Sequence, residues 1–217
     1  MGRARVPGAD RRASGPGTGP LRQTAGVPVS GVPEDAPPAF RRAVADLRAR
    51  PLRPEVFCED VPAPRRLAPW ALAIAAEVVS GGEDLASGRF VLLHDPAGQE
   101  GWHGAWRVVV LGRSSVEAEA ASDPLLGEVG WSWLAEALAA RGVAPTGLGG
   151  TVTRVLSTRF GELAGEDPGA EVEVRGSWSP LPDDVGSSLL AWTDLLCTAA
   201  GLPPEAAGSR PLPVREP

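Results

Sequence analysis

The sequence predicts an α+β fold, in which an antiparallel sheet of five to six strands carries helices packed mainly on one face. Segments of alternating apolar and polar residues, typical of half-buried strands, lie between three segments with apolar residues at helical spacing. Their order along the chain is α-β-β-β-β-α-β-β-α, which an antiparallel sheet with short connections accommodates. Hydrophobic residues make up 43% of the 217 residues, which is enough to build a core.

The first half of the predicted fold is one helix followed by up to four strands. Phe40, Val44 and Leu47 recur at helical spacing between Pro38 and Pro51, so a helix is expected there. Strands are expected over residues 54–60, 70–79, 90–94 and 106–113. Between residues 40 and 66 the basic residues outnumber the four acids, and they are Arg41, Arg42, Arg48, Arg50, Arg53, Arg65 and Arg66. They form either a solvated helix face, which is the commoner case, or a basic surface for an acidic partner.

The second half of the predicted fold is a helix, two strands and a last helix. Asp123 and Pro124 are residue types that start a helix, and Gly142 is of the type that ends one. The apolar stripe expected for this helix consists of Leu126, Val129, Trp133 and Ala137, widened by Leu134 and Leu138. Strands are expected over residues 151–160 and 170–178, and the last helix over 184–200.

The two later helices share a sequence spacing. Trp133 precedes Gly142 by nine residues, and Trp192 precedes Gly201 by nine residues. This spacing suggests a duplicated strand-strand-helix unit. It predicts that both helices end in the same way, at a glycine.

Both ends of the chain differ in composition from the middle. Residues 1–36 are rich in glycine, proline and arginine and poor in large apolar residues, so a disordered leader is expected. Residues 203–217 contain five prolines and are expected to be a second disordered tail. A single α+β domain is therefore expected over residues 37–202.

Charge and composition bear on the kind of partner and on the compartment. The formal charge of −6 argues against a nucleic-acid partner, although all 21 basic residues are arginine. No segment reaches the roughly 18 apolar residues of a membrane span, so no membrane partner is expected. Cys58 and Cys197 form no CxxC pair, and we expect two buried thiols in a reducing compartment, with one disulfide as the alternative. The expected location is the cytoplasm.

One segment is the richest candidate for a functional site. Its candidate binding residues are His94, Asp95, Glu100, Trp102 and His103. A histidine beside a carboxylate suits general acid–base catalysis, and two histidines with a carboxylate suit metal binding. Because the chain has no further histidine and no familiar catalytic motif, no catalytic or metal-binding residue is assigned and no cofactor is expected.

The same segment also fits structural interpretations. Asp95–Gly98 has the residue types of a type I turn, with aspartate first, proline second and glycine fourth. His94 shares strand parity with Phe90 and Leu92, which favours a place in the core or at its rim. A binding loop that presents Trp102 is the third interpretation.

A second glycine-rich segment, Gly147–Thr151, has the composition of a phosphate-binding loop. Phosphate loops lead into a helix N-terminus, whereas this segment leads into a predicted strand. The lysine of a Walker loop is also missing, because the whole chain lacks lysine. We therefore expect a flexible connection here.

Several blocks of the sequence carry a resemblance to a known family. They are Arg66–Trp70, Gly88–Gly98, Asp123–Leu126 with Trp131–Trp133, Gly150–Thr153, and Trp192–Cys197 with Ala200–Pro204. Over about residues 37–204 the chain resembles an actinobacterial family known only as domain of unknown function 3000. The resemblance implies a cytoplasmic bacterial protein, and it implies no activity, substrate or catalytic residue.

Two hypotheses about function follow. The first is a non-enzymatic partner-binding or adaptor protein that binds another protein or a second copy of itself as a homodimer. The seven tryptophans favour it, because exposed tryptophan is common at protein interfaces. The second is a small-molecule enzyme or ligand binder that uses the loop His94–Gly104, and it requires His94 or His103 to converge with Asp95 on a concave pocket.

Overall fold

The computed structural model describes residues 32–33, 35–164 and 169–204. Its longer elements are α1 (Pro38–Ala49), β1 (Val56–Val61), β2 (Trp70–Ser80), β3 (Glu83–His94), β4 (Trp106–Ser115), α2 (Ala118–Ser122), α3 (Leu126–Ala140), β5 (Thr146–Leu156), β6 (Ala170–Ser179) and α4 (Val185–Ala199). Two short 3-10 turns, η1 (Gly161–Leu163) and η2 (Pro182–Asp184), precede β6 and α4. Most of the predicted leader and tail lies outside the described residues.

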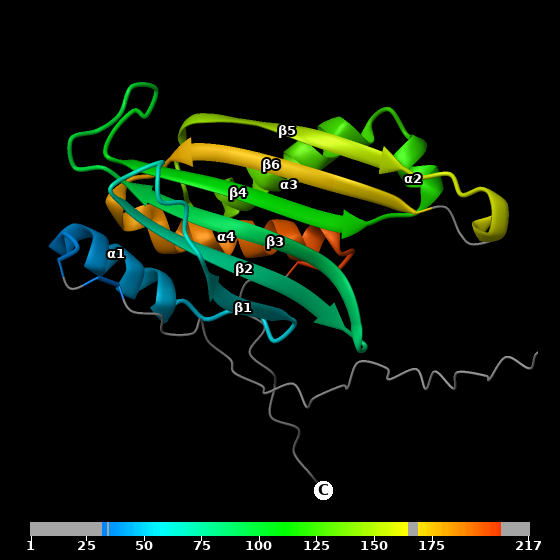
Figure 1. Ribbon diagram of the computed structural model, residues 1–217, viewed down its shortest axis with the longest axis horizontal. Coiled ribbons are helices and arrows are strands. Elements are labelled where there is room, and N and C mark those ends of the chain that lie inside the picture. Colours follow the sequence, from blue (N-terminus) through cyan, green and yellow to red (C-terminus); the bar gives the residue numbers. More distant parts are fainter. Residues whose placement is uncertain (1–31, 34, 165–168, 205–217) are drawn as a thin grey trace, which may run out of the picture.

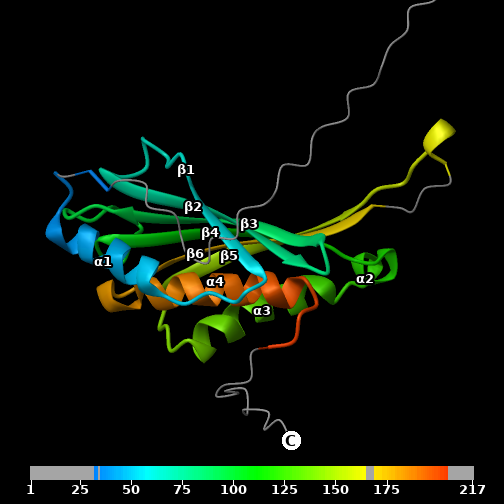
Figure 2. The same ribbon diagram turned by 90° about the horizontal axis from the view of Figure 1, so that it is seen from below.

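The six strands form one open antiparallel sheet in the order β1-β2-β3-β4-β6-β5 (Figure 1). The helices α1, α3 and α4 lie on the same face of this sheet (Figure 2). The predicted α+β class and element order are therefore confirmed, with the short helix α2 as an addition. Because β6 inserts between β4 and β5, the sheet ends in β1 on one side and in β5 on the other.

The core lies between the sheet and the helices. Trp178 of β6 and Trp192 of α4 are fully buried at its centre, together with Phe90 of β3. The Trp192 indole N–H donates to the carbonyl of Leu111 (2.9 Å), and the Trp178 indole N–H donates to the hydroxyl of Ser188 (3.3 Å). Each buried indole therefore keeps a hydrogen-bond acceptor, as a large amphipathic ring requires.

Two pairs of glycines lie opposite each other in neighbouring strands. Gly88 of β3 is opposite Gly112 of β4, and Gly150 of β5 is opposite Gly176 of β6. All four face the helix layer, where a side chain would have no room. The absence of a Cβ at these positions lets the helices lie close to the sheet.

Large side chains of the helices occupy the space above these glycines. A Cβ on Gly88 would lie 2.9 Å from the indole ring of Trp192 in α4. A Cβ on Gly150 would lie 2.6 Å from the indole ring of Trp131 in α3 and would also overlap the backbone carbonyl of Arg175. Both tryptophans thus need glycine beneath them.

The glycine pairs belong to two similarly built units. β3 and β4 are followed by α3, and β5 and β6 are followed by α4. β4 and β6 are antiparallel neighbours, and each helix packs on the strands of the other unit, α4 on β3 and β4 and α3 on β5 and β6. This arrangement has an approximate twofold axis between β4 and β6, which agrees with the duplicated strand-strand-helix unit that the sequence suggests.

Both later helices also end in the same way. Gly142 and Gly201 have positive φ angles of 69° and 73°. The N–H of Val143 donates to the carbonyl of Leu138, and that of Leu202 donates to the carbonyl of Cys197, each over 2.9 Å. With the preceding glycine N–H groups these bonds form two Schellman motifs, so the predicted helix ends at glycine are confirmed.

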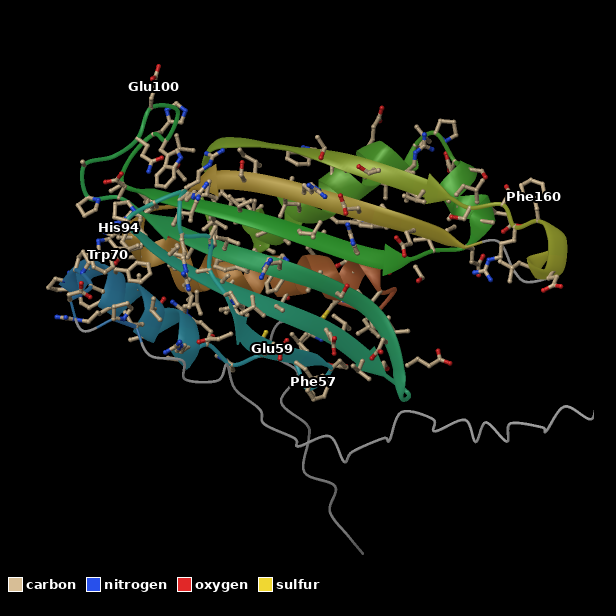
Figure 3. The ribbon with its side chains drawn as sticks, in the orientation of Figure 1. Phe57, Glu59, Trp70, His94, Glu100 and Phe160 are labelled. Atoms are coloured by element: carbon tan, nitrogen blue, oxygen red, sulfur yellow. The ribbon has the colours of Figure 1, made fainter. Side chains whose placement is uncertain are left out.

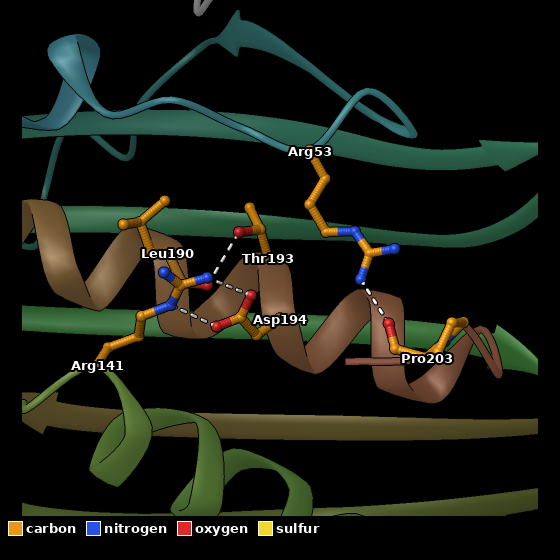
Figure 4. A network of polar contacts seen from close by, with 6 residues as sticks. All are labelled: Arg53, Arg141, Leu190, Thr193, Asp194 and Pro203. Atoms are coloured by element: carbon orange, nitrogen blue, oxygen red, sulfur yellow. Dashed lines mark hydrogen bonds and ion pairs between the residues drawn. The ribbon is translucent and has the colours of Figure 1, made fainter. Parts of the chain in front are cut away.

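Polar contacts connect the helices to one another and to the end of the described chain (Figure 4). Arg141, just after α3, donates two hydrogen bonds to the carboxylate of Asp194 in α4, over 2.6 and 2.8 Å. Arg53, just before β1, donates to the carbonyl of Pro203 over 2.8 Å. Ala36 is only 2% exposed and belongs to the core, so buried packing begins one residue before the predicted domain boundary at 37.

Some predicted boundaries are wrong, and each error has a physical reason. β3 begins at Glu83 and not at residue 90. The Gly81-Gly82 turn is tight, so β3 pairs with β2 from Glu83 onward. β5 begins at Thr146 and ends at Leu156, so the glycines predicted as a connection belong to a strand. α3 begins at Leu126, because the Asp123 carboxylate accepts the N–H of Leu125 (2.8 Å) and so stabilises the preceding turn.

The predicted faces of two helices also need correction. Val129, expected on the buried stripe of α3, is 43% exposed, and Gly130 takes the buried place against Val152. Arg48, expected on the outer side of α1, is largely buried, because its guanidinium forms an ion pair with Asp60 of β1 over 2.7 Å.

The close packing over Gly150 leads to a test. Gly150→Ala is expected to lower the free energy of unfolding by about 1–3 kcal/mol, because the added methyl group overlaps Trp131 and the β6 backbone. Gly149→Ala is the matched control, since a Cβ there meets nothing within 4 Å. Urea unfolding of both variants measures the difference, and equal stability of the two would contradict this account of the packing.

Candidate functional site

The loop between β3 and β4, residues 95–105, is the predicted candidate site. The N–H of Asp95 donates to the carbonyl of Ala105 over 2.9 Å and closes its base. The carbonyl of Asp95 accepts the N–H of Gly98 over 2.9 Å, which is the bond of the predicted turn. The Asp95 carboxylate accepts the N–H of Ala97 and the side-chain amide of Gln99, over 3.0 and 3.1 Å. Asp95 therefore uses both of its carboxylate oxygens to shape the loop.

His94 lies at the base of this loop and is only 4% exposed. Its ring stacks on Trp106 of β4, with 3.9 Å between ring centroids, and Phe40 of α1 lies about 6 Å from both rings. Its Nδ1 is 3.0 Å from the carbonyl oxygen of Ala105. The side chain thus belongs to the packing that joins α1 to the sheet, in agreement with its predicted place in the core or at its rim.

The surroundings of His94 disfavour its charged form. Burial lowers the pKa of His94, while the hydrogen bond to the Ala105 carbonyl and the negative charge of Asp95 act in the opposite direction. A neutral imidazole stacked on Trp106 is consistent with this balance. His94 is buried and does not line the pocket of the loop.

The other candidate residues lie elsewhere on the loop. Glu100 is at its exposed tip, while His94 is at its base near α1 (Figure 3). His103 is exposed and lies over Gly147 of β5, where a Cβ would be 2.7 Å from the imidazole Cδ2 atom. Trp102 is half-buried, and its backbone N–H donates to the carbonyl of Gln99 over 3.0 Å.

A shallow open pocket of about 470 Å³ lies along the loop. It is lined by Pro96, Ala97, Gly98, Gln99, Glu100, Gly104 and Ala105. Of the five candidate residues only Glu100 contributes to this lining, so the two histidines and Asp95 do not converge on it. Among the described residues, His, Cys, Asp and Glu side chains also form no group of three that could hold a metal ion.

The basic surface considered for residues 40–66 is largely engaged within the chain. Besides the Arg48–Asp60 pair, Arg50 pairs with Asp46 over 2.9 Å, and Arg53 pairs with Glu55 over 3.2 Å. These ion pairs leave less positive charge for an acidic partner than the arginine count suggests.

Neither Cys58 nor Cys197 is in a disulfide. Cys197 is buried in α4, and Cys58 is half-buried in β1, where burial raises the pKa of its thiol to about 12. A thiol with such a pKa stays protonated near neutral pH and is a poor nucleophile. The disulfide considered as an alternative is not formed.

Sequence reasoning missed an apolar surface at the other end of the molecule. Residues 155–164, which we call the arm, continue β5 beyond the helix layer (Figure 2). The exposed apolar side chains of the arm are Val155, Leu156, Phe160 and Leu163. Phe160 is 78% exposed (Figure 3). The predicted strand over 151–160 contains three of these residues, but its pattern does not show that this segment lies at a sheet edge.

The sheet face opposite the helices carries ion-paired side chains and an exposed valine. Glu173 of β6 forms ion pairs with Arg175 on the same strand and with Arg113 on β4, each over 2.5 Å. The hydrogen bonds from Arg175 and Arg113 lower the pKa of Glu173, so this carboxylate stays charged at neutral pH. Val109 of β4 is exposed on the same face.

The fold defines an α+β protein with an open sheet that is covered by helices on one face. None of the helices in that part of the chain is both long and apolar enough to cross a membrane. The family model described as "Protein of unknown function (DUF3000)" matches residues 36–209, and the chain belongs to this family. Comparisons with curated proteins and with solved structures gave no match.

The buried His94 predicts a pH dependence of stability. Since burial lowers its pKa in the folded state, the unfolded chain takes up a proton first as the pH falls through about 6.5. The free energy of unfolding is therefore expected to decrease as the pH is lowered from about 8 to about 5. His94→Gln should remove this part of the pH dependence, as measured by urea unfolding.

His103→Gln is the matched control for this measurement, because it removes the exposed histidine of the same loop. It should leave the pH dependence unchanged. Loss of the pH dependence in His103→Gln, or its persistence in His94→Gln, would show that His94 is not the group responsible.

Proposed function

We propose that this chain is a non-enzymatic, cytoplasmic partner-binding or adaptor protein, and that the arm is its contact surface for another protein. The observation that carries the proposal is the exposure of four apolar side chains on ten consecutive residues, with Phe160 at 78%. Apolar side chains scattered singly over a surface need no explanation, whereas a group of them beyond the helix layer is typical of an interface.

The energetics of the arm support a protein partner. Burying a large apolar side chain is worth roughly 1.5–3 kcal/mol, and aromatic residues are enriched among those that dominate binding. The arm also lies beyond the helices, so a partner can approach it from several directions (Figure 2). A small molecule would find no concave wall there.

The candidate site supports a non-enzymatic role. His94 is stacked on Trp106, Asp95 shapes its own loop, and His103 lies over β5. General acid–base catalysis needs such groups within hydrogen-bond reach of one reacting atom. Two cysteines outside any disulfide, one of them buried, support a reducing compartment such as the cytoplasm.

Capture of partners from native lysate of the source cell by the full chain tests this proposal. Phe160→Glu is expected to reduce the specifically retained protein by about tenfold or more, because a charge replaces the apolar contact. Leu181→Glu is the matched control, since Leu181 is also an exposed apolar residue (61%) but lies outside the arm.

The result that would contradict the proposal is specific to the arm. If wild type retains no protein, or if Phe160→Glu and Leu181→Glu retain it equally, the arm is not the contact surface. Circular dichroism of both variants verifies that they are folded.

A further inference from the structure

The edge of the sheet formed by β5 is long and accessible. Nine of its eleven residues are exposed, and the other two are half-buried. Its sequence contains no proline, lysine or acidic residue, and Arg154 is its one charged residue. An edge of this kind presents unpaired backbone groups to any strand that fits, and proteins usually block it with charges, prolines or short length.

The opposite edge, β1, has such protection. It is six residues long, and Pro54 and Pro62 flank it closely. Glu59 places one exposed acidic residue within the strand, while Asp60 is paired with Arg48. The two edges of the same sheet therefore differ, and only β5 lacks the charges, prolines and short length that usually prevent an edge strand from pairing with another strand.

The charge of Arg154 does not protect the β5 edge. Its guanidinium donates to the backbone carbonyls of Asp123 and of Ala121, at the end of α2. The side chain is thus held against the helix layer by backbone acceptors. The edge itself is neutral along its length.

The hydrogen-bond pattern shows which backbone groups of β5 point outward. Ser157 donates its N–H to the carbonyl of Gly169 over 2.8 Å, which extends the β5–β6 ladder. In an antiparallel pair, alternate residues bond to the neighbouring strand. From Gly149 to Leu156, where the register is regular, the odd-numbered residues of β5 therefore bond to β6, and the even-numbered residues direct their N–H and C=O groups away from the sheet.

We propose that β5 pairs with β5 of a second copy of the chain, antiparallel, about a twofold axis at Thr151. This inference rests on the partner-binding role proposed above and names a second copy as one partner. Pairing about Thr151 aligns residues 149–153 of the two copies as a regular ladder with Thr151 at its centre, because the register of β5 against β6 shifts between Thr146 and Gly149, just before this segment. It also brings outward-pointing even residues opposite each other, such as Val152 and Gly150 of the second copy.

Charge complementarity favours a second copy as the occupant. A twofold interface must be self-complementary, because each residue of the patch meets the same patch. In this register the aligned segment 149–153 contains no charged residue, so no charge is opposite a like charge. The chain has a net charge of −6, so two copies approach most easily along a neutral edge.

The test places like charges at the twofold axis. Thr151→Glu puts a carboxylate opposite its own copy, while within the chain it lies beside Arg175. Light scattering of the full wild-type chain should give twice 22.4 kDa, and Thr151→Glu should weaken association by about tenfold or more. An equimolar mixture of Thr151→Glu with Thr151→Lys should restore the dimer, because opposite charges then meet.

Thr153→Lys is the matched control. It adds a charge to the same strand beside Glu173, but in the proposed register it faces Gly149 of the second copy, so the dimer should persist. A monomeric wild type, equal effects of Thr153→Lys and Thr151→Glu, or a mixture that stays monomeric would each overturn the proposal. Circular dichroism and thermal melting establish that every variant is folded.

The two proposals fail separately. If wild type is monomeric but Phe160-dependent capture of another protein persists, edge pairing is wrong and the arm retains its role. If the charge-swapped dimer forms but no other protein is captured, edge pairing stands and the arm's proposed role is wrong.

Discussion

The whole architecture depends on the close approach of two helices to the sheet. Trp192 of α4 lies over Gly88, and Trp131 of α3 lies over Gly150, at distances that exclude any side chain beneath them. These contacts bring both helices onto the same face and bury the central tryptophans. The helices must then lie side by side, where Arg141 and Asp194 join them. The approximate twofold arrangement of the two units follows from using the same contact twice.

Placing the helices on one face determines which surfaces remain for function. A sheet covered on one side keeps its other face and its edges available. Arg113 and Arg175 on the open face are paired with Glu173, and the β1 edge carries the exposed Glu59. The exposed apolar side chains of the arm and the uncharged segment 149–153 of the β5 edge remain, and both belong to one continuous segment of chain. At the base of the candidate loop, His94 and Trp106 lie about 6 Å from Phe40 of α1.

The sequence predicts most of the fold because period-two and helical patterns are local properties. Strands over 70–79 and 170–178 and the glycine stops at Gly142 and Gly201 are of this kind. The segment 147–151 is misread as a connection, because glycine usually marks a turn, whereas Gly150 here makes room for Trp131. The turn at Asp95 is predictable for the same local reason. The β5 edge is not, because its position depends on β6 pairing between β4 and β5.

Packing constrains the side chains on one face of β5 and leaves those on the other face unconstrained. Its even-numbered residues face the helix layer, so Gly150 and Val152 are constrained by Trp131 and Gly130. Its odd-numbered residues face the open side, where packing does not prevent a lysine or a glutamate. These positions nevertheless hold Gly149, Thr151, Thr153 and Val155. Packing therefore does not account for these uncharged positions, whereas the proposed strand pairing would account for Thr151, because a charge there would face its own copy across the twofold axis.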